Sequence, residues 1–169
     1  MKHLVLALAV VLAPVAAWAD EDGLTFSPKA TEACLKAAGD MAAERLCIGA
    51  SANACMEATE GGYSTYGMGG CISREVDYWD ARLNAAYKEA MKSAKQADKD
   101  NGAGTNGPQS QAVALRDMQR AWIPYRDAAC LWEYSKWGGG TGGGPASASC
   151  LMTLTGEQAL VLEHSSLEY

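Results

Sequence analysis

Two stretches with the periodicity of long amphipathic helices constrain this sequence most. One surrounds residues 79–87 and the other residues 119–130. In the first, apolar residues recur at alternating gaps of four and three, the spacing of a single helix face; they are Ile72, Val76, Trp79, Leu83, Ala86 and Ala90. The second has the same spacing in Leu115, Met118, Trp122, Tyr125, Ala129 and Trp132. Because a polar loop joins the two helices, we expect them to pack against each other as an antiparallel hairpin.

Polar side chains flank both apolar faces. They are Asp80, Asn84 and Tyr87 on the first helix, and Gln119, Arg126 and Asp127 on the second. We interpret Asp80, Asn84 and Arg126 as a half-buried network that fixes how the two helices pair. A catalytic pair of carboxylates is the alternative, but no histidine lies nearby, and neighbouring arginines would keep Asp80 and Asp127 ionised instead of supplying a protonated acid. We therefore expect no enzymatic activity.

The first 19 residues are typical of a secretory signal peptide. A basic start at Lys2 and His3 precedes an apolar run from Leu4 to Ala17, and a small residue stands at Ala19. Cleavage after Ala19 predicts a periplasmic or secreted protein. No later segment reaches the roughly 20 apolar residues that a membrane-spanning helix requires. Because no cysteine stands at the cleavage point, we expect no lipid anchor.

The charge of the chain narrows the class of partner. The full sequence has 14 basic and 20 acidic side chains, and loss of Lys2 with the signal peptide changes its formal net charge from −6 to −7. Nucleic acid is an improbable partner for an acidic protein. A negative charge of this size instead favours encounter with cationic molecules.

The six cysteines all lie in the expected exported part, where an even number indicates disulfides. They are Cys34, Cys47, Cys55, Cys71, Cys130 and Cys150. No two are spaced as Cys-x-x-Cys, and His164 is the one histidine after the signal peptide. We therefore expect three disulfides and neither a metal site nor a cofactor. Six cysteines allow 15 pairings; Cys130 with Cys150 is our best single prediction, and Cys71 then pairs within the N-terminal group.

Shorter helices and two polar or glycine-rich loops complete the expected fold. A first helix is predicted from near Pro28 to near Gly39, a second over residues 41–58 with Leu46, Ala50 and Ala54 facing inward, and a last one from Pro145, weakened at Gly156. The loop at 98–109 has Gly102 where a calcium-binding loop needs a third oxygen ligand and Gln109 in place of the closing glutamate, so we expect no calcium there. Residues 61–70 are predicted to form a glycine-rich surface loop, and the candidate contacts with a partner are Tyr63, Tyr66 and Met68.

The combined spacing of these motifs resembles the LprI-like lysozyme inhibitor domain. The residues that carry the resemblance are Cys71, Asp80, Leu83, Asn84, Tyr87, Gln119, Trp122, Arg126, Asp127, Cys130, the Gly139–Thr141 loop, Cys150 and Thr155. It covers about residues 71–163, so we expect a signal peptide at 1–19, a cysteine-rich helical extension at 20–70 and the LprI-like domain at 71–163. Pro124 departs from the pattern and predicts a bend in the second long helix.

The resemblance implies an all-α, disulfide-bonded exported domain without catalytic chemistry, some of whose relatives inhibit lysozyme. The first functional hypothesis is an exported binding protein that inhibits a basic lysozyme by non-covalent contact. The second is a structural or interaction module of the cell envelope that has a different partner and shares the fold alone.

Overall fold

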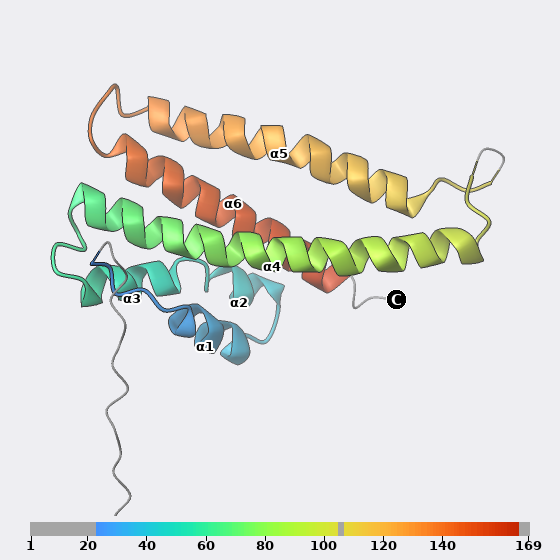
Figure 1. Cartoon of the computed structure of the whole chain (residues 1–169), viewed down its shortest axis with the longest axis horizontal. Coiled ribbons are helices and arrows are strands. Elements are labelled where there is room, and N and C mark those ends of the chain that lie inside the picture. The colour runs from blue at the N-terminus through green and yellow to red at the C-terminus, as the bar shows by residue number, and fades with distance from the viewer. Residues whose placement is uncertain (1–22, 105–106, 166–169) are drawn as a thin grey trace, which may run out of the picture.

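The computed structural model describes residues 23–104 and 107–165, all of whose regular elements are helices. The expected signal peptide lies outside the described residues. The helices are α1 (Lys29–Ala37), α2 (Met41–Arg45), α3 (Ala50–Ala58), α4 (Thr65–Asp100), α5 (Gln111–Ser135) and α6 (Gly143–Ser165). Figure 1 shows α4 and α5 running in opposite directions, with α1, α2 and α3 on the other side of α4 from α5. The predicted all-α fold with a long-helix hairpin is confirmed.

Three disulfides join neighbouring parts of this fold, as expected from the six cysteines. They connect Cys34 with Cys47, Cys55 with Cys71, and Cys130 with Cys150. The first pair lies among the short N-terminal helices, the second links α3 to α4, and the third links α5 to α6. Each disulfide closes a loop of 13 to 20 residues. Because a closed loop lowers the entropy of the unfolded chain, each bridge stabilises the fold by about 3 kcal/mol.

The core lies mainly between α4 and α6. Trp79 of α4 is fully buried and belongs to the same apolar cluster as Leu83, Ala159 and Leu160. Gly156 of α6 permits this close packing, because a Cβ atom at that position would lie 3.1 Å from Trp79 Cδ2 and 2.8 Å from Ile48 Cδ1. The predicted last helix is α6, which continues through Gly156, and the missing side chain there allows the two helices to approach.

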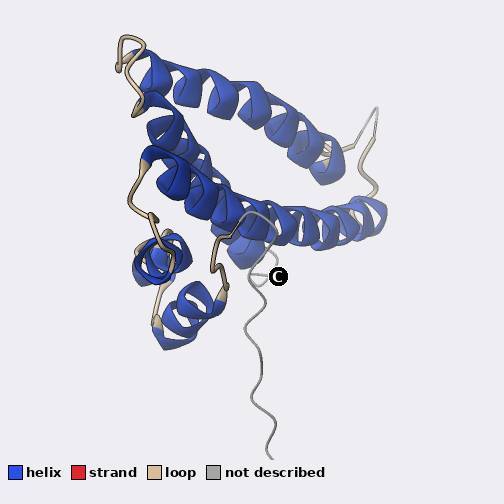
Figure 2. Ribbon diagram, turned by 60° about the vertical axis from the view of Figure 1, so that its left-hand side comes forward, coloured by secondary structure: helices blue, strands red, loops and turns tan. Residues whose placement is uncertain are grey.

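The position of α6 changes the role of α5. Figure 2 shows α6 between α5 and part of α4, and α5 contacts both helices. The predicted apolar face of α5 is wrong for several of its members, because Met118 is 40% exposed and Tyr125 and Trp132 are each 63% exposed. The residues of α5 that are buried are Gln119 and Cys130. Helix α5 also continues through Pro124, and the bend expected there stays a prediction.

The predicted single helix over residues 41–58 is wrong. It is divided into α2 and α3 by Gly49, whose φ of 99° lies in the left-handed region that favours glycine. The division also turns side chains outward: Leu46 is 84% exposed and Ala54 is exposed, although both were expected to face the core. Ala52 is buried in the core instead.

Candidate functional site

The glycine-rich segment before Cys71 is helical over most of its length, contrary to the expected loop. Helix α4 begins at Thr65, and the Ser64 hydroxyl caps it by accepting a hydrogen bond from the Gly67 amide at 3.0 Å. Glycine is needed at Gly67 because a Cβ atom there would lie 2.4 Å from the Gly61 carbonyl oxygen. The glycines thus allow the chain to fold back closely on the start of α4 instead of breaking the helix.

Two tyrosines project from this tightly folded end of α4. Tyr63 is 63% exposed and Tyr66 is 73% exposed. Met68, the third candidate contact, is part-buried and packs against the main core. The Cys55–Cys71 disulfide closes the segment that carries both tyrosines, and the Ser64 cap lies between them, so the two phenol rings are presented from a fixed support.

An open groove lies beside Tyr66, between the first turns of α4 and α6. Its volume is about 640 Å³, and its lining is largely apolar or without side chains; it consists of Leu24, Thr65, Tyr66, Gly69, Gly70, Ser73, Gly144, Pro145 and Ala148. Two carboxylates precede the tyrosines closely in sequence, since Glu57 lies near the end of α3 and Glu60 in the following turn, and both are exposed. This end of the molecule therefore combines aromatic rings, a shallow groove and negative charge.

The polar motif residues form local pairs instead of one network. Asn84 donates a hydrogen bond to Asp80 at 2.8 Å on the exposed face of α4. On α5, Arg126 donates to the neighbouring Asp127 and lies 5.0 Å from the centre of the Trp122 ring. Within the described residues, no hydrogen bond or ion pair joins these two groups. The expected network of Asp80, Asn84 and Arg126 between the helices is therefore wrong.

Different residues make the polar connections between the long helices. Gln158 of α6 donates a hydrogen bond to the buried Gln119 of α5 at 3.1 Å. Arg82 of α4 forms a two-point ion pair with Glu163 of α6. Tyr87, also a motif residue, is part-buried and packs against the core. Of the predicted polar set, Gln119 is the one that links helices by a hydrogen bond, and it does so through α6.

Glu75 is a buried polar residue that the sequence analysis missed. It is 0% exposed, and its Oε1 accepts hydrogen bonds from Thr31 Oγ1 at 2.8 Å, Gly49 N at 2.9 Å and Trp79 Nε1 at 3.1 Å. Its Oε2 accepts one from Ala52 N at 2.6 Å. Two of these donors are backbone amides at the start of α3, where the helix dipole favours an anion. The sequence does indicate that Glu75 is buried: it lies three positions after Ile72 and four before Trp79, and therefore on the apolar face of α4.

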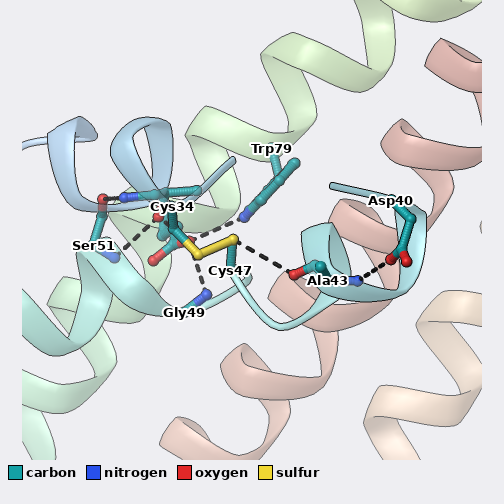
Figure 3. The surroundings of a disulfide bond; sticks show 9 residues. Cys34, Asp40, Ala43, Cys47, Gly49, Ser51 and Trp79 are labelled. Carbon is teal, nitrogen blue, oxygen red and sulfur yellow. Dashed lines mark hydrogen bonds between the residues drawn. A yellow bond between two sulfur atoms is a disulfide. The ribbon is translucent and has the colours of Figure 1, made fainter. Parts of the chain in front are cut away.

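The surroundings of Glu75 are closed and structural in character. Figure 3 shows Trp79, Gly49 and Ser51 near the Cys34–Cys47 disulfide. Thr31 and Ser51 exchange two further hydrogen bonds, from each backbone amide to the other side chain, at 2.9 and 3.0 Å. Because every one of these groups is already bonded and buried, the cluster holds α1, α3 and α4 together and leaves no space for a ligand.

The family model for lysozyme inhibitor LprI matches residues 55–162, well over half of this chain. The chain belongs to the LprI family. The match contains the Cys55–Cys71 and Cys130–Cys150 disulfides, whereas Cys34 and Cys47 precede it. Glu75 lies inside the LprI-family region, and three of its donors lie before it. This carboxylate and its partners therefore fasten the preceding helices to the LprI-family region.

A relative of similar sequence carries no functional description in its name. The Uncharacterized protein YecT of Escherichia coli (strain K12) is 34% identical over 61 residues, which are 36% of this chain and 36% of that protein. The chain therefore matches about a third of the length of this curated relative. No solved structure matches the chain.

Among the residues that the structure describes, no group of three or more histidine, cysteine, aspartate or glutamate side chains could hold a metal ion. None of the described helices is long and apolar enough to cross a membrane. The exposed tyrosines and the groove beside Tyr66 make this end of α4 the candidate site; we call it the tyrosine end and define it by Glu57, Glu60, Tyr63, Tyr66 and that groove.

Proposed function

We propose that this protein is an exported inhibitor of a basic lysozyme, and that it acts by non-covalent binding through the tyrosine end. Membership of the LprI family is the observation that carries the proposal. The family description names an inhibitor of lysozyme, and the chain offers a surface suited to contact with another protein. No chemical step is involved, so the protein acts by occupying lysozyme in a stoichiometric complex.

Export places the inhibitor where lysozymes attack bacteria. Three disulfides are typical of proteins outside the cytosol. The basic and apolar pattern of residues 1–19 supports a signal peptide with cleavage after Ala19. N-terminal sequencing of protein recovered from the periplasm or the medium tests this part of the proposal, and a chain that still begins at Met1 would contradict it.

Tyr63 and Tyr66 supply the contact area in this proposal. Tyrosine is enriched among the residues that dominate binding energy, since one side chain combines a large apolar surface with a hydroxyl group. The disulfide that closes this segment and the helix cap between the two tyrosines reduce the entropy that would be lost when the rings are immobilised. The groove beside Tyr66 provides a hollow for a projecting side chain of the partner.

Charge supports a basic partner. The formal net charge is −6 for the full sequence, and the exposed Glu57 and Glu60 contribute negative charge in the segment that directly precedes the tyrosines. Opposite charges accelerate association and make it sensitive to salt. Inhibition should therefore weaken as the ionic strength rises and the Debye length falls below about 8 Å.

The direct test measures lysis of bacterial cell walls by a basic lysozyme with increasing amounts of the exported protein. The double substitution Tyr63→Ala and Tyr66→Ala should weaken inhibition by about tenfold or more, the loss expected for two central aromatic contacts. A matched control replaces Tyr125 and Tyr134, two exposed tyrosines of α5, and should inhibit like wild type. Both variants should keep the wild-type melting temperature.

Two results would count against the proposal. If wild-type protein in large molar excess at low salt leaves lysis unchanged, the alternative of an envelope module with another partner is favoured. If inhibition occurs but the control substitutions on α5 reduce it as much as those at the tyrosine end, the inhibitory function stands and the assigned surface is wrong.

A further inference from the structure

The second half of α4 presents a row of four lysines to solvent. At about 100° per residue these side chains fall within an arc of about 60°, and they extend over about 16 Å along the helix; we call them the lysine row, which consists of Lys88, Lys92, Lys95 and Lys99. All four are exposed. Ala86, Ala90 and Ala94 are buried on the opposite side of the same helix. The packing of small residues against the core thus fixes the lysines on the outer face.

The three carboxylates nearest in sequence, Glu89, Asp98 and Asp100, do not neutralise the row. Asp100 accepts a hydrogen bond from Gln96 and forms no ion pair among the described residues. Asp98 accepts hydrogen bonds from Ser110 and from the first amides of α5, so its charge is directed toward that helix. Glu89 lies 3.9 Å from Lys92 in a pair that is largely exposed to water, where such pairs contribute little. In the described part of the chain, Lys88, Lys95 and Lys99 form no ion pair. The row is therefore a positive surface on an acidic protein.

The floor between the lysines is partly apolar. A shallow depression of about 570 Å³ is lined by Tyr87, Met91, Gln96 and the four lysines, and most of its surface is carbon. An adjoining depression brings Arg116 of α5 next to Lys95, Tyr87 and Met91. Ammonium groups around an aromatic and aliphatic floor match the boundary of a phospholipid bilayer, where phosphates lie beside glycerol and acyl carbons.

The row is far from the tyrosine end. Tyr66 and Lys88 are 22 residues apart in the same helix, a distance of about 33 Å along its axis. This separation is about four times the Debye length at physiological ionic strength, so each surface responds to its own local charge and not to the net charge of the molecule. A partner at one end leaves the other accessible.

We propose that the lysine row docks this protein on the surface of an anionic phospholipid membrane. Charge complementarity carries the proposal: each lysine near an anionic surface strengthens binding by about fivefold, and four act together from one rigid helix. The contact is peripheral, because the apolar floor is small and no described helix could cross the bilayer. The docking does not depend on the proposed inhibition of lysozyme.

The test uses protein recovered from the periplasm of an expressing bacterium, sedimented with vesicles and with no lysozyme present. We expect binding to phosphatidylcholine vesicles that contain phosphatidylglycerol, little binding to pure phosphatidylcholine, and loss of binding as salt is raised. Replacing the lysine row by glutamine should lower the partition coefficient by about tenfold or more. The matched control removes the same number of positive charges elsewhere, at Lys29, Lys36, Arg45 and Lys136.

Circular dichroism and thermal unfolding should show that both quadruple variants are folded. The proposal is overturned if the wild-type protein ignores anionic vesicles, or if the control variant loses as much binding as the lysine-row variant. A parallel measurement with soluble polyphosphate separates a second possibility. Binding to that polymer without binding to vesicles would assign the row to a free polyanion and would also overturn membrane docking.

Discussion

Arg82 of α4 and Glu163 of α6 meet in a two-point ion pair. Arg82 Nε donates to Glu163 Oε1 at 2.9 Å, and Arg82 Nη2 donates to Oε2 at 2.7 Å. The same guanidinium donates to the Tyr78 hydroxyl at 2.9 Å and lies 5.2 Å from the centre of the Trp79 ring. The pair therefore joins the two helices that enclose most of the core, at a point where Trp79 is already buried.

Replacing Arg82 by glutamine should destabilise the fold moderately. The side chains of Arg82 and Glu163 are 30% and 27% exposed, so solvent partly screens the ion pair. Its two parallel hydrogen bonds are nevertheless a favourable geometry. We expect a loss of about 1 kcal/mol in the free energy of unfolding, measured with urea. Arg116→Gln is the control, since Arg116 pairs with the adjacent, exposed Asp117. Equal stability of the two variants would show that the bridge between α4 and α6 contributes nothing specific.

Replacing Glu75 by glutamine should be more harmful, although the two side chains have nearly the same shape. Both carboxylate oxygens of Glu75 accept hydrogen bonds, so the amide nitrogen of glutamine must face a donor in either orientation. An unmet buried donor costs about 1–3 kcal/mol. The measurement is urea unfolding of the oxidised protein. Glu89→Gln, an exposed change on the same helix, should leave stability within about 0.5 kcal/mol of wild type.

If the Glu75→Gln variant has the same free energy of unfolding as wild type, the hydrogen bonds described for Glu75 are wrong. The N-terminal helices offer a second measurement, because Glu75 accepts from residues of α1 and α3. Hydrogen exchange should accelerate at the Gly49 and Ala52 amides in the variant. Unchanged protection at both amides would place them in other hydrogen bonds.

Asp98 should make stability depend on pH in the acidic range. Hydrogen bonds from the Ser110 hydroxyl and from the Gln111 and Ala112 amides hold the pKa of Asp98 below its ordinary value of 3.8. The folded protein therefore binds this proton less readily than the unfolded chain. The resulting stabilisation is present above pH 3.8 and is lost as the pH falls through the lowered pKa of the folded state.

Comparison of wild type with Asp98→Asn isolates this contribution from the other carboxylates. The difference in free energy of unfolding between the two proteins should be constant at neutral pH and should shrink below about pH 4. Asp100→Asn serves as the control, because the Asp100 carboxylate accepts from Gln96 and makes no bond to α5. If the difference in free energy of unfolding grows as the pH falls, the ionised carboxylate of Asp98 does not cap α5.

Local patterns in the sequence predicted a substantial part of the fold. The periodicity from Ile72 to Ala90 correctly identified the buried face of α4, because neighbouring positions on one helix determine it. The number of cysteines outside the expected signal peptide likewise indicated three disulfides. Contacts between distant residues were harder to predict: the partners of Glu75 include Thr31 and Gly49, which are 44 and 26 residues away.

The exposure of α5 could not be predicted from its own periodicity. Trp132 and Tyr125 have the spacing of an apolar face, yet each is 63% exposed, because both line an open hollow between α5 and α6 that no other described helix fills. The candidate site could likewise be predicted only in part. The sequence identified Tyr63 and Tyr66 as candidate contacts, whereas the groove beside Tyr66 is formed partly by Gly144 and Pro145 of α6, more than 70 positions later.

Two glycines in the first turns of α4 should respond in opposite ways to alanine. A Cβ atom at Gly67 would lie 2.4 Å from the Gly61 carbonyl oxygen and 2.6 Å from Gly62 Cα, so Gly67→Ala must displace backbone. At Gly69 a Cβ atom would meet nothing within 4 Å, and alanine should gain about 0.5–1 kcal/mol from its higher helix propensity. Thermal unfolding of the two single variants should therefore give a lower melting temperature for the first and a higher one for the second. Equal shifts in the same direction would show that the backbone at residues 61 and 62 does not pack against α4 as described.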